Sequence, residues 1–114
     1  MRVLGKAMTD PNKAVDYIIA NSTKYAEAKA NRVYIEEFRK SKKALLMNQC
    51  DESTVNAREQ FAYSHPEYIQ LLEGLKVAVG IEESLKWQME AARLRIEIWR
   101  SQEASNRATD RTIR

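Results

Sequence analysis

Residues 68–103 have the sequence YIQLLEGLKVAVGIEESLKWQMEAARLRIEIWRSQE. A repeat with intervals that alternate between three and four residues runs through Tyr68, Leu71, Leu75, Ala78, Glu82, Leu85, Met89, Ala92, Ile96, Trp99 and Glu103. Nine of these eleven positions are apolar. Such a heptad repeat is typical of an α-helix that packs along its length against another helix, so the sequence predicts one long helix with an apolar seam.

Residues 11–48 are predicted to form a second long helix. Asp10 and Pro11 are typical of a helix start, because Asp caps free amides and Pro tolerates the first helical position. No Gly or Pro interrupts the segment from Lys13 to Gln49. Spacing slightly above 3.6 residues predicts a partner-facing stripe made of Val15, Ile19, Ala26, Ala30, Val33, Tyr34, Phe38 and Leu45.

The segment between the two long helices predicts a short helix over residues 54–63, with Ser53 as its cap. Ser64 and Glu67 then predict a capping box, with Pro66 in the first turn of a helix over 66–106. Residues 1–9 show no periodicity and are expected to form a flexible arm. The last residues, 107–114, are expected to form a basic tail.

These elements predict a single all-α domain over 1–114, built as an antiparallel hairpin of two helices that are each roughly 57–62 Å long. A two-helix hairpin cannot cover the apolar residues outside the seam, which are Ile69, Leu72, Val77, Val79, Ile81, Trp87, Leu94 and Ile98. We therefore expect a homodimer with four-helix-bundle packing. The predicted interface with a second copy or a partner comprises Leu71, Leu75, Leu85, Trp87, Met89, Leu94, Ile96 and Trp99. The alternative is a monomer whose short middle helix folds over the exposed flank.

Glu82 is a carboxylate among apolar seam positions. Such a carboxylate either lies near an edge of the seam or is paired, for example with Arg32 or Lys29, and polar seam residues select register and partner number in coiled coils. Gly74 and Gly80 lie inside the same helix and indicate either a close helix approach or a tolerated weakness.

The sequence predicts no enzymatic activity, no cofactor and no metal site. Cys50 and His65 are the only cysteine and the only histidine, and their spacing matches neither a zinc site nor a nucleophile with its base. Glycine-rich phosphate loops and nucleophile elbows are absent from the 114 residues. Without an apolar run of membrane-spanning length or a signal peptide, the expected compartment is the cytoplasm.

Charge is unevenly distributed along the sequence. Lys and Arg outnumber Asp and Glu by ten to five in residues 1–50 and by seven to four in 84–114, whereas acidic residues dominate 51–83 by seven to two. Two basic clusters predict contact with nucleic acid, through Arg39, Lys40, Lys42, Lys43, Arg100, Arg107 and Arg111. The alternative is that these charges only keep the helices solvated. Tyr34, Phe38 and Trp99 could stack on bases if exposed, but their position beside the apolar stripes favours core packing.

Four runs of residues resemble a family of small helical proteins encoded in tailed bacteriophages and prophages: YAEAKA (25–30), IEEFRK (35–40), AYSHPEY (62–68) and WRSQEASNR (99–107). The resemblance implies a viral protein that works in the host cytoplasm near DNA metabolism, from an early or recombination-related gene region. It implies no particular binding residues. Together with the basic clusters, it favours a non-enzymatic accessory factor in DNA replication or recombination that contacts nucleic acid or a protein bound to it.

Two other functions remain open at this stage. One is a protein-binding module, either an inhibitor or an adaptor of a host or phage enzyme, that uses the apolar flanks of the C-terminal helix. Exposure of Trp87, Leu94 and Ile98 would favour it. The other is a purely structural spacer.

Overall fold

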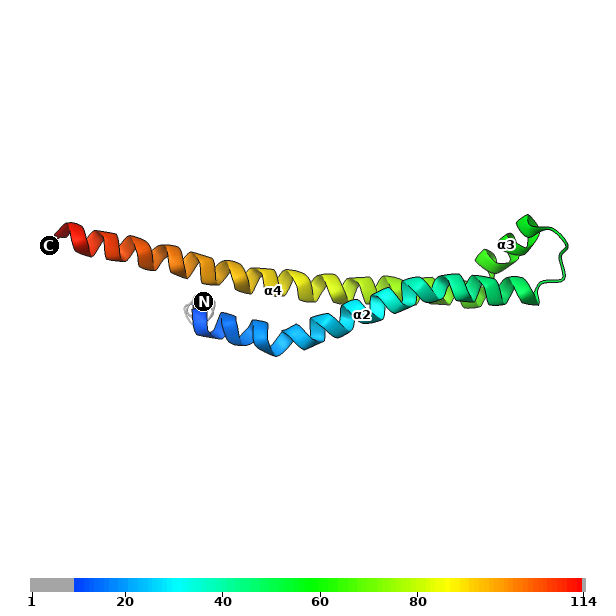
Figure 1. Cartoon of the computed structure of the whole chain (residues 1–114), viewed down its shortest axis with the longest axis horizontal. Coiled ribbons are helices and arrows are strands. Elements are labelled where there is room, and N and C mark those ends of the chain that lie inside the picture. Colours follow the sequence, from blue (N-terminus) through cyan, green and yellow to red (C-terminus); the bar gives the residue numbers. More distant parts are fainter. Residues whose placement is uncertain (1–9, 114) are drawn as a thin grey trace. The chain divides into compact units, whose positions relative to one another are not determined.

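The computed structural model describes residues 10–113 and contains three helices over this range, α2 (Pro11–Gln49), α3 (Val55–Ser64) and α4 (Pro66–Ile113) (Figure 1). No strand occurs among the described residues. The fold is an all-α helical hairpin with a short middle helix, which confirms the predicted fold class. The arm predicted for residues 1–9 lies outside the described residues.

Both ends of α2 lie close to the predicted positions. The Asp10 side chain caps the helix, because its Oδ1 accepts a hydrogen bond from the Asn12 amide at 2.9 Å. The helix ends at Gln49, one residue later than expected. The cap of α3 is Thr54 rather than Ser53, since Thr54 Oγ1 accepts from the Ala57 amide at 3.2 Å.

The capping box predicted at Ser64 and Glu67 does not form. Ser64 is the last residue of α3, and its hydroxyl donates to the Gln60 carbonyl at 2.7 Å. His65 takes the capping position of α4, because its Nδ1 accepts from the Glu67 amide at 3.1 Å. The residue before a proline is restricted to extended backbone, and His65 has φ −66° and ψ 135°. Its non-helical backbone therefore ends one helix and caps the next.

The basic tail predicted for 107–114 is wrong over the described part, since α4 continues to Ile113. Neither Gly nor Pro follows Gly80, so nothing in the backbone stops the helix. Two hydroxyl groups fold back onto the helix, from Thr109 to the Ser105 carbonyl at 3.0 Å and from Thr112 to the Ala108 carbonyl at 2.9 Å. Arg111 lies in the last turn, where a positive charge interacts favourably with the helix dipole.

The described residues divide into two packed units. The first unit pairs α2 up to Tyr25 with α4 from Ser84 onward, and the second unit contains residues 26–83, including α3. In the first unit the Tyr17 hydroxyl donates to Gln88 Oε1 across the two helices. In the second unit Leu46, Ala62 and Tyr68 form a buried cluster, which holds α3 against the two long helices.

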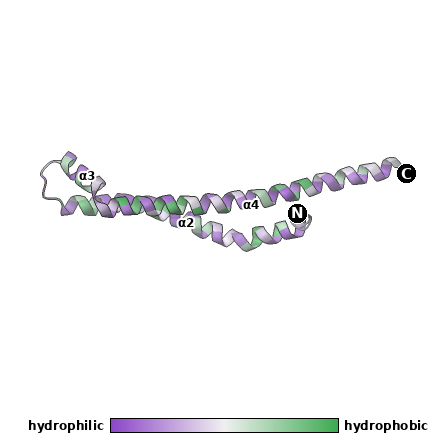
Figure 2. Ribbon diagram, turned by 180° about the vertical axis from the view of Figure 1, so that it is seen from behind, coloured by the Kyte–Doolittle hydropathy of each residue, from purple (hydrophilic) through white to green (hydrophobic). Residues whose placement is uncertain are grey.

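The predicted seam of α4 is confirmed by burial. Every seam position from Tyr68 to Ile96 is buried or half-buried, and only Trp99 is exposed. Figure 2 shows hydrophobic and hydrophilic residues alternating along α4, as expected for a helix with distinct faces.

The stripe predicted for α2 is wrong. Its members are exposed, apart from the half-buried Phe38. The buried and half-buried face instead follows its own heptad repeat through Ala14, Ile18, Asn21, Tyr25, Ala28, Arg32, Ile35, Arg39, Lys42 and Leu46. Four of these residues are polar, which conceals the repeat from a search for apolar positions.

Gly74 and Gly80 of α4 do not mark a close approach of another helix of this chain. A side-chain carbon added at Gly74 or Gly80 would meet no neighbouring atom within 4 Å. Both positions are open, so each glycine is a tolerated weakness in the helix.

Candidate interaction surfaces

Arg32 and Glu82 form an ion pair in the seam of the second unit. The Arg32 Nε donates to Glu82 Oε2 at 2.6 Å, and the Nη2 group donates to Oε1 at 3.0 Å. A third hydrogen bond joins Arg32 to Glu36 at 3.0 Å. Glu82 is only 6% exposed. The bonds to Glu82 and then to Glu36 raise the pKa of Arg32 further above its usual range. The predicted pairing of Glu82 is confirmed, and the two-pronged geometry fits a role in helix register.

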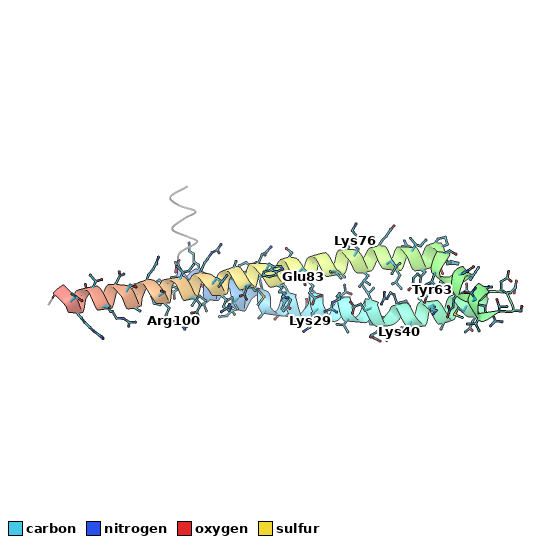
Figure 3. The ribbon with its side chains drawn as sticks, turned by 90° about the horizontal axis from the view of Figure 1, so that it is seen from above. Lys29, Lys40, Tyr63, Lys76, Glu83 and Arg100 are labelled. Carbon is cyan, nitrogen blue, oxygen red and sulfur yellow. The ribbon has the colours of Figure 1, made fainter. Side chains whose placement is uncertain are left out.

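Three of the basic residues predicted near the end of α2 lie together. Arg39, Lys40 and Lys43 line a surface hollow of about 470 Å³ with Tyr63 and Tyr68, all within the second unit. Figure 3 labels Lys40 on α2 and Tyr63 on α3. The Lys43 ammonium lies 4.8 Å from the centroid of the Tyr63 ring. We call this the basic hollow.

Acidic neighbours offset much of the charge of the basic hollow. Lys40 pairs with Glu37 at 3.1 Å, and Lys43 pairs with Glu59 at 3.4 Å. The pKa of Lys43 is raised, first by its hydrogen bond to Tyr63 and then by Glu59. Arg39 is half-buried and has no ion pair within residues 10–113. Arg39 is therefore the cation of the hollow whose charge is least compensated.

Lys42 does not join the basic hollow. It pairs with Glu67 at 3.0 Å, which lowers the pKa of that carboxyl group. The two side chains line a separate hollow of about 320 Å³, together with Ile35, Phe38, Gln70, Leu71 and Gly74. The predicted four-residue cluster is thus divided between two hollows.

The predicted basic residues near the C-terminus belong to the first unit. Arg100 pairs with Glu97 at 3.5 Å on the surface of α4 (Figure 3). Two turns earlier, Arg93 pairs with Glu90 at 2.6 Å, which lowers the pKa of Glu90 and raises that of Arg93. Arg107 and Arg111 are exposed. Contact of these basic residues with nucleic acid stays a prediction.

The aromatic side chains considered for base stacking are not core residues. Tyr34 is 65% exposed and stacks on Phe38, with ring centroids 5.9 Å apart and planes inclined by 11°. Trp99 is 41% exposed. Core packing is therefore wrong for Tyr34 and Trp99 in the single chain.

The predicted interface residues divide into two groups. One group is half-buried along the inner seam of α4 and consists of Leu71, Leu75, Leu85, Met89 and Ile96. The other is exposed, with Trp87 at 62%, Leu94 at 48% and Trp99 at 41%. The first group belongs to the heptad repeat that packs toward α2. Only the second group is therefore accessible to a partner.

Three of the exposed apolar residues of α4, Trp87, Leu94 and Ile98, belong to a second heptad repeat that the sequence analysis did not recognise as a repeat. This repeat, which we call the outer seam, keeps the same alternating intervals through Ser84, Trp87, Ala91, Leu94, Ile98, Ser101, Ser105, Ala108 and Thr112. None of its nine residues is charged, although α4 is rich in charge. All are exposed except the half-buried Ala91. The absence of charge at every third and fourth position was a signal available in the sequence.

The only histidine and the only cysteine lie in the connections between helices. His65 caps a helix, and Cys50 is buried in the connection before α3. No group of three or more potential metal ligands occurs among the residues described by the structure. None of the described helices combines the length and the hydropathy that crossing a membrane requires.

Comparison with known proteins adds no relatives. The chain matches no family model, no curated protein and no solved structure.

Proposed function

We propose that this chain is a non-enzymatic interaction protein that binds an α-helical partner through the outer seam of α4. The observation that carries the proposal is the exposure of Trp87 at 62%, Leu94 at 48% and Ile98 at 55% on one uncharged face. Exposed apolar residues that adjoin one another are typical of protein-binding surfaces. Their heptad spacing suits a partner that is itself a helix.

The arrangement of α4 supports the same reading. Its inner seam packs in register with α2, while charged residues lie on the strips between the inner and outer seams. Glu90 and Arg93, for example, pair along one such strip. A helix with two seams separated by charged strips can pack against two different helices at once.

Photo-cross-linking in cells tests this proposal. We would replace Leu94 with a photo-reactive phenylalanine analogue and compare it with the same replacement at Glu27, an exposed residue of α2. We expect a protein adduct from position 94 and none from position 27. Absence of any adduct from position 94 would contradict the proposal.

Contact with nucleic acid is the second candidate function, and Arg39 is the observation that favours it. This half-buried guanidinium has no acidic partner within residues 10–113 and lines the basic hollow beside the Tyr63 ring. A cation next to an exposed aromatic ring is a common way to hold a phosphate and stack a base. The resemblance to small phage proteins supports a setting in DNA replication or recombination in the host cytoplasm.

Titration of labelled single- and double-stranded DNA at two salt concentrations tests this second function. Binding that depends on phosphate contacts weakens steeply as salt rises. We expect Arg39→Gln to weaken binding, whereas Lys24→Gln, which removes an exposed charge from α2, should leave it unchanged. Equal binding by both variants would exclude the hollow as the contact.

A further inference from the structure

We infer that the outer seam of α4 binds the outer seam of a second copy of this chain, with the two helices parallel and in register. The inference rests on the proposed function, because it names the partner of the same surface. Four observations support it.

The first observation is the order of residue types in the outer seam. Its repeat places Ala91 and Ile98 at the position equivalent to a of a heptad, and Trp87 and Leu94 at the position equivalent to d. A β-branched residue at a with Leu at d favours a parallel two-stranded coiled coil. Ser84 and Ala91 are small residues on either side of Trp87, which leaves room for two facing indole rings.

The second observation is the charge beside the seam. In a parallel, in-register pair, each residue of one flank faces the residue five positions later on the other chain. Glu90 then faces Arg95 of the second copy, and Glu97 faces Gln102. Neither pair brings like charges together. Parallel pairing therefore joins opposite charges at Glu90 and Arg95 and brings no like charges together at these positions.

The opposite orientation fails on the same residues. An antiparallel pairing that brings the large apolar side chains together places Trp87 opposite Ile98 and Leu94 opposite Ala91. In that register Glu90 of each chain faces Glu97 of the other. Two pairs of facing carboxylates would repel each other along the centre of the contact.

The third observation concerns the last turns of α4. From Arg100 to Thr112 every residue is exposed except the half-buried Glu103. A helical segment of this length is marginal in water when it packs against nothing. Ser101, Ser105 and Ala108 continue the outer seam here with small side chains, which permit close contact with a second helix.

The fourth observation is the amount of accessible surface. The chain exposes 8874 Å², whereas a folded monomer of 13.2 kDa typically exposes about 6,400 Å². The difference is larger than the roughly 800 Å² that each partner contributes to a standard interface. The chain therefore leaves more surface uncovered than a folded monomer of its mass usually does.

Light scattering at about 100 µM, where an association of micromolar affinity is nearly complete, tests the inference. Ile98→Glu and Ile81→Glu form a matched pair, since both isoleucines lie in α4 and are 55% and 52% exposed, but only Ile98 belongs to the outer seam. We expect twice the chain mass for the wild type and Ile81→Glu. For Ile98→Glu we expect a dissociation constant raised about 100-fold, because a carboxylate would be buried.

A monomeric wild type overturns the inference whatever the variants do, and so does an Ile98→Glu protein that dimerises as tightly as the wild type. Circular dichroism on each variant confirms that the helices remain formed. A monomeric wild type that still yields a heterologous adduct from position 94 would leave the proposed function standing. The two failures are therefore distinguishable.

Disulfide cross-linking tests the orientation. In a Cys50→Ser background, Ser101→Cys places one thiol at a d position, and parallel chains bring the two thiols of the dimer together. We expect this variant, with no other variant present, to oxidise rapidly to a cross-linked dimer. A link that forms only when Ser84→Cys and Ser101→Cys chains are mixed would overturn the parallel arrangement, since antiparallel chains place position 84 opposite position 101.

Discussion

Glu82 accepts two hydrogen bonds from the guanidinium group of Arg32, at 2.6 and 3.0 Å, in the seam between α2 and α4. The carboxylate is 6% exposed, so its charge depends on this partner. A slip of either helix by one heptad would separate the two groups. The pair thus selects one register among several that the apolar residues alone would allow.

Glu82→Ala is expected to lower the thermal unfolding midpoint by roughly 5–10 °C, because it removes the main partner of a guanidinium group in the seam. The double variant Arg32→Leu/Glu82→Leu should recover most of the loss, since two apolar side chains remove both charges at once. Thermal melts followed by circular dichroism measure both effects. A double variant less stable than Glu82→Ala would contradict this view of the pair.

Leu46→Ala is expected to destabilise the chain by about 2–5 kcal/mol, because Leu46 is fully buried against Ala62 and Tyr68. Leu45→Ala is the matched control, since the neighbouring leucine is 52% exposed and should change stability by less than about 0.5 kcal/mol. Urea unfolding gives both values. Equal losses would show that the second unit does not pack as described.

His65→Ala should cost about 1 kcal/mol, because α4 loses the Nδ1 acceptor that caps the Glu67 amide. His65→Asn should retain most of the stability, since the Asn side-chain oxygen can accept the same hydrogen bond. Urea unfolding of the two variants checks this prediction. Ala and Asn variants of equal stability would rule out capping as the role of this side chain.

The Lys42–Glu67 pair predicts a pH dependence of stability. The pKa of Glu67 is lowered from its usual value of 4.5, chiefly by a hydrogen bond from Lys42. A carboxyl group with a lowered pKa in the folded state adds stability above its unfolded pKa and loses it as the pH falls through the folded pKa. Glu67→Gln should therefore melt a few degrees below the wild type at pH 7, and the gap should close below pH 4.5. A gap that does not narrow as the pH falls below 4.5 would need another cause.

The helix class and the inner seam of α4 could be predicted from the sequence, because its apolar residues dominate the repeat over five heptads. The seam of α2 could not, since Asn21, Arg32, Arg39 and Lys42 occupy inward positions that a hydropathy pattern assigns to solvent. Long cationic side chains pack their alkyl parts inside while their charged ends reach an acid, as Lys42 does with Glu67. The partner of Lys42 is distant in sequence, so no local pattern within α2 reveals it.

Two further errors in reading the sequence have different physical causes. The sequence predicts too early an end for α4, because the serines and Asn106 are weak helix formers, although nothing after Gly80 breaks the helix. The sequence indicates the apolar flank of Trp87, Leu94 and Ile98 but not its continuation as the outer seam, because the other members are mostly small residues such as Ser101 and Ala108, which contribute little to hydropathy. What marks this face is the absence of charge.

Fluorescence of Trp87 tests the association of the outer seam most directly. In the Trp99→Phe variant Trp87 is the only tryptophan left, and its side chain is 62% exposed in the single chain. As the chain concentration rises from nanomolar to about 100 µM, the emission should shift to shorter wavelength and iodide quenching should fall. If Trp87 keeps the emission wavelength and the iodide quenching of a solvent-exposed indole at every concentration, this result would contradict a dimer built on this face.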